Sequence, residues 1–93
     1  MNRYVKEFRR LVAAFLEGKE SFWGFHEAFL ARWVHLPKDA LPPDEREVWN
    51  EIYAWILTSI PDPVSVEDGA RGVIGAAELR ERLRRHPWLT SPA

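Results

Sequence analysis

The sequence contains no cysteine, which excludes a disulfide framework and any metal site built on thiolates. It also contains no run of 18 consecutive apolar residues, so we expect no membrane-spanning helix. The first ten residues, MNRYVKEFRR, are charged from the start and lack the apolar segment of a secretory signal peptide. These absences predict a cytoplasmic protein whose fold is stabilised by packing alone.

Aromatic residues, by contrast, are abundant. Five Trp and five Phe occur among the 93 residues, and 46% of all residues are hydrophobic. Each large ring can remove roughly 150–250 Å² of surface from water, so even a short chain with this composition can form a core. The length indicates a single domain, residues 1–93.

Charge is unevenly distributed, although the chain as a whole carries a net charge of only −1. Residues 1–38 have a net charge of +3, residues 39–68 of −7 and residues 69–93 of +3. The acidic middle third could be a surface for a basic partner. The alternative is a solvated helix face, with acidic first turns that complement helix dipoles.

Hydrophobic periodicity and capping signals predict four helices. Gly18 is placed to end the first helix and Ser21 to cap the second. A proline ends the second helix, and Pro43 fits the first turn of the third. The predicted helices are residues 2–17, 22–35, 43–60 and 75–86, followed by a C-terminal tail, 87–93.

The segment between the last two helices, PDPVSVEDGARGVIG, is predicted to be irregular because two prolines open it and three glycines interrupt it. We expect an ordered loop, 61–75, that covers the core through valines and Ile74; a strand at 64–66 would have no obvious partner. Trp88 and Leu89 should fold back as an apolar plug. The predicted fold class is all-α: a compact antiparallel four-helix bundle with a short last helix and a long irregular loop before it.

No motif predicts catalysis or metal binding. His26 and Glu27 begin the zinc-protease pattern H-E-x-x-H, but Leu30 occupies the position of its second histidine. His35 falls on the opposite helix face and His86 on another helix. No serine lies in a G-x-S-x-G elbow, and DGARGVIG is not a phosphate-binding loop. We therefore expect no enzyme activity, no metal and no cofactor.

The sequence also allows two alternative functions. Exposed aromatic residues, Trp23 and Trp55, could form the interface of a structural or oligomeric protein, including a homodimer. Arg80, Arg84 and Arg85 on the last helix could contact nucleic acid phosphates. The intervening glutamates, Glu78 and Glu81, break up that basic patch, so nucleic acid is the least favoured of these partners.

The order of motifs resembles a known family, the colicin D immunity protein and the wider set of bacterial self-protective colicin-like immunity proteins. The likeness begins in a helix–turn–helix stretch, FRRLVAAFLEGKESFWGFHEAFLARW. It continues in an acidic helix closed by a proline–aspartate loop, VWNEIYAWILTSIPDP, and in the short final helix, VIGAAELRERL.

This resemblance implies a four-helix bundle that is not an enzyme and that has a protein partner. Proteins of that family bind a basic nuclease toxin through an acidic surface and block its active cleft. Seven acidic residues of the middle third could have this role here: Asp44, Glu45, Glu47, Glu51, Asp62, Glu67 and Asp68.

Overall fold

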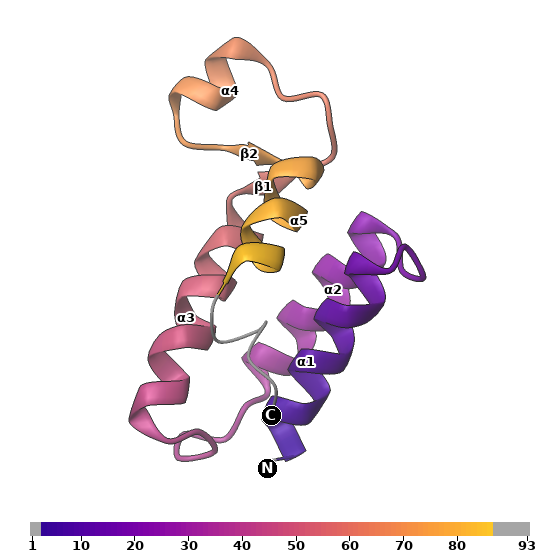
Figure 1. Cartoon of the computed structure of the whole chain (residues 1–93). Helices are drawn as coiled ribbons and strands as arrows, with labels where there is room; N and C mark the ends of the chain where they lie inside the picture. The colour runs from indigo at the N-terminus through magenta and orange to yellow at the C-terminus, as the bar shows by residue number, and fades with distance from the viewer. Residues whose placement is uncertain (1–2, 87–93) are drawn as a thin grey trace.

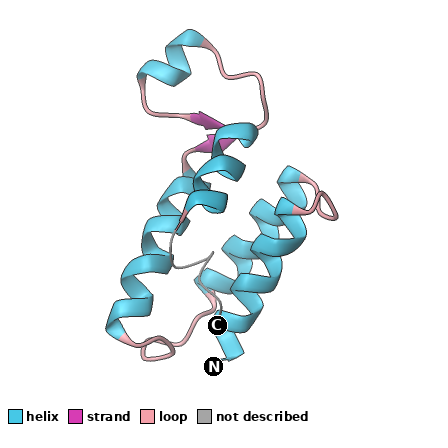
Figure 2. Cartoon of the chain, in the orientation of Figure 1, coloured by secondary structure: helices cyan, strands magenta, loops and turns pink. Residues whose placement is uncertain are grey.

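The computed structural model describes residues 3–86 and shows a mostly helical protein (Figures 1 and 2). Within that range there are five helices and one small parallel sheet of two strands. The elements are α1 (Arg3–Leu16), α2 (Phe22–Val34), α3 (Pro43–Leu57), β1 (Ser59–Ile60), α4 (Val66–Ala70), β2 (Ile74–Gly75) and α5 (Ala76–Arg85).

The first two helices and the turn between them are as predicted. Gly18 has a φ of 77°, the left-handed conformation that favours glycine after a helix. The hydroxyl of Ser21 accepts a hydrogen bond from Gly24 N at 3.0 Å and so caps α2. These two local signals bring α1 and α2 side by side (Figure 1).

The core is built largely from aromatic rings. Phe8 of α1 lies at its centre, with ring centroids 4.9 Å from Phe29 and 5.2 Å from Trp49. Phe15 stacks on Phe25 at 4.4 Å. All five of these residues are buried, so the aromatic supply seen in the sequence is used mainly in packing α1, α2 and α3 together.

The predicted third helix, 43–60, is too long at its C-terminal end. It begins at Pro43 as expected, but α3 ends at Leu57. The next residues form β1, which pairs in parallel with β2, so that Ser59 lies opposite Ile74 and Ile60 opposite Gly75. This pairing competes with the helix, because it satisfies backbone groups that a longer α3 would have bonded internally.

The prediction of an irregular loop over 61–75 is also wrong in part. This segment contains α4, whose first turn is capped by the Ser65 hydroxyl, which accepts from Asp68 N at 3.1 Å. Among the described residues no strand forms at 64–66, where the sequence offered no obvious partner. Ile74 is buried as expected, but Val66 is 90% exposed rather than packed on the core.

The loop and α4 form one end of an elongated molecule (Figure 1). α5 begins at Ala76, and its inward residues Leu79 and Leu83 are buried as predicted. The predicted plug, Trp88 and Leu89, and the tail 87–93 lie outside the described residues. Of the helices between residues 3 and 86, none has both the length and the apolar character needed to cross a bilayer.

Candidate binding surface

The acidic residues singled out in the sequence do not form one patch. Asp44, Glu45, Glu47 and Glu51 lie on α3, whereas Glu67 and Asp68 lie on α4, beyond the other end of that helix (Figure 1). Only three of the seven, Asp44, Glu47 and Glu51, lie on one exposed stripe. Their positions i, i+3 and i+7 place them within about 60° of one another around the helix axis. We call this stripe the α3 acidic face.

The carboxylates of this face are poorly compensated by nearby charges. Of the eight acidic residues in 39–68, only Glu51 approaches a basic side chain within the described range, with its Oε2 atom 4.0 Å from His86 Nε2. Outside that segment, four of the six acidic residues are ion-paired: Glu7, Glu17, Glu78 and Glu81. Most of the negative charge of the middle third is therefore not neutralised by ion pairs among the described residues.

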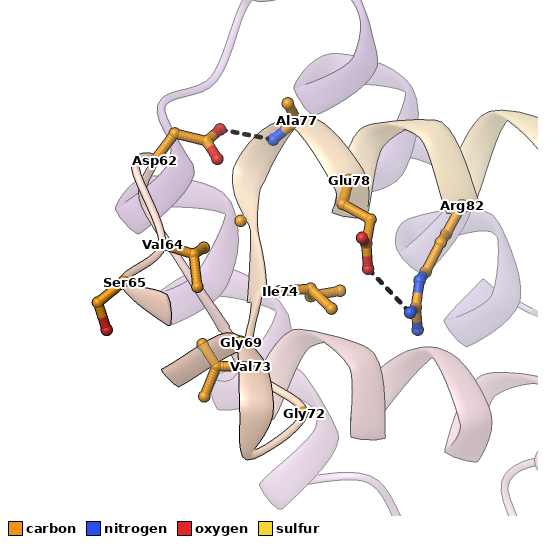
Figure 3. A pocket seen from close by; sticks show the side chains of 11 residues that line it. Asp62, Val64, Ser65, Gly69, Gly72, Val73, Ile74, Ala77, Glu78 and Arg82 are labelled. Carbon is orange, nitrogen blue, oxygen red and sulfur yellow. Dashed lines mark hydrogen bonds and ion pairs between the residues drawn. The ribbon is translucent and has the colours of Figure 1, made fainter. Parts of the chain in front are cut away.

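Asp62 has a structural role that its place in the sequence did not indicate. Its Oδ2 atom accepts a hydrogen bond from Ala77 N at 2.8 Å, in the first turn of α5 (Figure 3). The cap residue of that helix, Gly75, has no side chain to satisfy this amide. Asp62 therefore acts as a capping group supplied from a distant part of the chain.

Glu67 and Asp68 lie in the first turn of α4, where negative side chains stabilise a helix N-terminus. Asp68 is half-buried and Glu67 is exposed. Neither makes an ion pair in the part of the chain that is described. They lie on a short helix, α4, and are therefore separate from the acidic residues of α3.

A hollow of about 460 Å³ lies beside Glu51, where α3 meets the end of α5. It is lined in part by Trp55, whose ring lies 5.8 Å from that of His86 and 5.7 Å from the Arg82 guanidinium. Sequence reasoning missed it. Helical spacing places Glu51 with Trp55, and Arg82 with Arg85, but it does not show that the two helix faces meet.

A second hollow, of about 620 Å³, lies between the α4 loop and α5 (Figure 3). Its walls are mainly Val64, Val73, Ile74 and glycine backbone, and a 2.8 Å ion pair between Glu78 and Arg82 lies at its edge. The carboxylate of Asp62 is turned toward Ala77 N. The polar groups are thus paired with each other or with the backbone, and they do not converge on a common point.

The histidines are placed apart from one another. His26 is half-buried, and its ring packs 5.7 Å from Phe22 and 5.2 Å from Trp23. His35 is exposed at the end of α2, and the side chain of His86 is 12% exposed beside Trp55. Between residues 3 and 86, no three histidine or carboxylate side chains gather as a metal site requires.

The structure also places the residues of the two alternative functions, an aromatic interface and nucleic acid binding. Trp23 on α2 is 52% exposed, and Trp55 on α3 is half-buried. The Arg80 guanidinium lies 4.5 Å above the Phe15 ring, and Arg85 is paired with Glu81 at 2.8 Å. Arg84 is exposed.

Comparisons of the chain with protein-family models, with curated proteins and with solved structures gave no match.

Proposed function

We propose that this protein is a non-catalytic binding protein that blocks a basic protein partner through the α3 acidic face. The resemblance to colicin D-type immunity proteins makes a nuclease toxin the expected class of partner. One observation carries the proposal: Asp44 and Glu47 are exposed and make no ion pair within residues 3–86, while most acidic residues outside the middle third are paired.

Long-range attraction between this face and a basic surface would speed association, and the effect would fall as salt screens it. Glu45 lies about 100° around the helix from Asp44, outside the α3 acidic face. It is also half-buried, so we expect it to contribute less than its neighbours. Trp55 follows Glu51 by one turn and offers a partly exposed ring, which is a common anchor in interfaces. A lysine or arginine of the partner could contact both groups.

The fold that fits this function is an antiparallel bundle of α1, α2, α3 and α5, with α4 as an insertion before the last helix. Two features support this arrangement. Short connections join α1 to α2 and α2 to α3, and short connections favour antiparallel neighbours. α5 packs against both α1 and α3.

The test is capture of a basic nuclease domain by the double variant Glu47→Lys with Glu51→Lys. We expect the captured partner to be lost, because two attractive contacts become repulsive. The association rate of the unmodified protein should fall at least about tenfold between roughly 20 and 300 mM salt.

The matched control is Glu67→Lys with Asp68→Lys, which makes the same change in charge on α4. It should keep most of the capture. Equal capture by the α3 variant and the unmodified protein, or an association rate insensitive to salt, would show that the α3 acidic face is not the binding site.

A further inference from the structure

A second charged stripe, of opposite sign, lies on α1. Arg3, Lys6 and Arg10 are all exposed and, together with Glu7, line an open hollow of about 460 Å³. We call these three residues the α1 cationic face. Their spacing, i, i+3 and i+7, is the same as that of Asp44, Glu47 and Glu51 on α3.

The α1 cationic face points directly away from the core. The buried residues of α1 are Val5, Phe8, Val12 and Phe15. At about 100° per residue, the three cations are centred on the opposite side of the helix. The cations are therefore presented to solvent.

These cations have few partners within the chain. Lys6 makes no ion pair among residues 3–86, and Arg10 has only a loose contact, 3.8 Å, with Glu7 while its side chain remains 76% exposed. Arg3 donates a hydrogen bond of 2.9 Å to the Tyr4 hydroxyl, which raises the pKa of the Arg3 guanidinium above its ordinary value. All three positive charges are available to an external carboxylate.

The two faces cannot meet within one molecule. α1 packs against α2 and α5, and α3 packs against the same two helices, so α1 and α3 stand on opposite sides of the core. Figure 1 shows them at opposite sides of the molecule. Each face is turned outward from its own helix, and the cationic and acidic stripes therefore lie on different sides of one copy.

We propose that the α1 cationic face of one copy binds the α3 acidic face of a second copy. The equal spacing places three cations opposite three carboxylates when the helices run parallel. When they run antiparallel, the middle pair is offset by one residue, or about 1.5 Å. Such a contact is heterologous: one copy keeps its acidic face free and the other keeps its cationic face free, so the pair can add further copies head to tail.

The interaction should be weak and sensitive to salt, because exposed ion pairs are individually weak and are screened by ions. The net charge of −1 means that little overall repulsion opposes association. We therefore expect short chains of copies at several hundred micromolar protein and low salt, and monomers near about 300 mM salt.

This inference uses the acidic face of the proposed function but does not depend on a nuclease partner. A second copy and a basic partner would compete for the same carboxylates, those of the α3 acidic face. The α1 cationic face belongs to self-association alone, which allows the two ideas to be tested separately.

The experiment is sedimentation velocity at about 20 and 300 mM salt, over a range of protein concentrations, with two neutralised variants. The first is Lys6→Gln with Arg10→Gln, and the second is Glu47→Gln with Glu51→Gln. Each should remain monomeric at low salt. An equimolar mixture should form a heterodimer and stop there, because only one cationic and one acidic face remain intact.

Matched controls carry the same changes in charge elsewhere: Arg71→Gln with Arg84→Gln, and Glu67→Gln with Asp68→Asn. Both should associate like the unmodified protein. Circular dichroism shows whether each variant is folded, and the mixing experiment reports a positive signal that a misfolded variant could not give.

Several results would overturn the inference: a monomeric unmodified protein at every concentration at low salt, association that persists in either α3 or α1 variant, or a mixture that stays monomeric. Binding of duplex DNA by the α1 cationic face in a gel shift, with no self-association, would also overturn it. If Lys6→Gln with Arg10→Gln lost self-association but still captured a basic nuclease domain, both proposals would stand. If it captured none and still lost self-association, only the proposed function would fail.

Discussion

Asp62 and Gly75 show how two residues far apart in sequence depend on each other. The Asp62 carboxylate reaches Ala77 N because Gly75 leaves room beside it; a methyl group on Gly75 would overlap Asp62 Oδ1 and lie 3.1 Å from Val64 Cγ2. Asp62 thus differs from the other acidic residues of the middle third. Its side chain stabilises the start of α5, and we expect changes here to affect stability before binding.

The first prediction concerns Asp62→Ala. Removing the carboxylate leaves Ala77 N without its acceptor, so the free energy of unfolding should fall by about 1 kcal/mol. Urea denaturation measures this change. Glu67→Ala is the control, because its side chain is exposed and unpaired among the described residues; it should alter stability by less than about 0.5 kcal/mol. Similar losses in both variants would contradict the capping role.

The second prediction concerns Gly75→Ala, alone and combined with Asp62→Ala. The added methyl group must displace the Asp62 carboxylate, and we expect a loss of about 1–3 kcal/mol. The double variant should lose less than the sum of the two single losses, because the displaced group is already absent. Urea denaturation of all four proteins gives the coupling energy. Strict additivity would show that the two residues do not share one site.

At the scale of the element, the turn between α1 and α2 is set by its backbone hydrogen bonds. Lys19 N donates to Ala14 O at 2.9 Å, and Gly18 N donates to Phe15 O at 3.2 Å. This is the Schellman arrangement, which requires the left-handed conformation at Gly18. The turn positions α2 so that its buried rings reach α1.

The third prediction compares alanine at two glycines. Gly18→Ala should lower the free energy of unfolding by about 1 kcal/mol, because a side chain disfavours positive φ. Gly69→Ala should be neutral or stabilise by up to about 1 kcal/mol, because Gly69 lies in α4 with only Val64 Cγ1 near its added methyl, at 4.0 Å. Chemical denaturation with unchanged m-values would measure both effects. A destabilised Gly69→Ala, or an unaffected Gly18→Ala, would contradict the backbone argument.

At the scale of the whole molecule, stability is concentrated in the aromatic core. Trp49 is completely buried and contacts rings of both α1 and α2, at 5.2 Å from Phe8 and 6.1 Å from Phe29. Trp23 is half in solvent and packs edge-on against Phe22. A domain of this size has a total stability of only about 5–15 kcal/mol, so one such residue can decide whether it folds.

The fourth prediction is therefore a comparison of two tryptophans. Trp49→Ala should cost about 3–5 kcal/mol, because it opens a cavity between three helices. Trp23→Ala should cost about 1 kcal/mol or less. Thermal and urea denaturation followed by circular dichroism measure both. Comparable losses would mean that the core is not organised around Trp49.

Much of the helical architecture could be read from local signals. The positions of α1 and α2 follow from three- and four-residue apolar spacing, from Gly18 and from Ser21. The start of α3 follows from Pro43 and the end of α5 lies near the predicted one. These signals act between residues a few positions apart, and the same short-range physics operates in the unfolded chain and in the folded protein.

The remaining features depend on contacts between distant residues. β1 and β2 are fifteen positions apart, and their pairing shortened α3 in a way that periodicity could not reveal. Asp62 was expected to be a binding residue because it is acidic; its bond to Ala77 N exists because the sheet brings the loop back to α5. Residue spacing placed Asp44, Glu47 and Glu51 on one stripe. Only the packing of the helices places this stripe and the α1 cationic face on opposite sides of the core. Helix formation depends on neighbouring residues, whereas side-chain burial between helices is a property of the assembled fold.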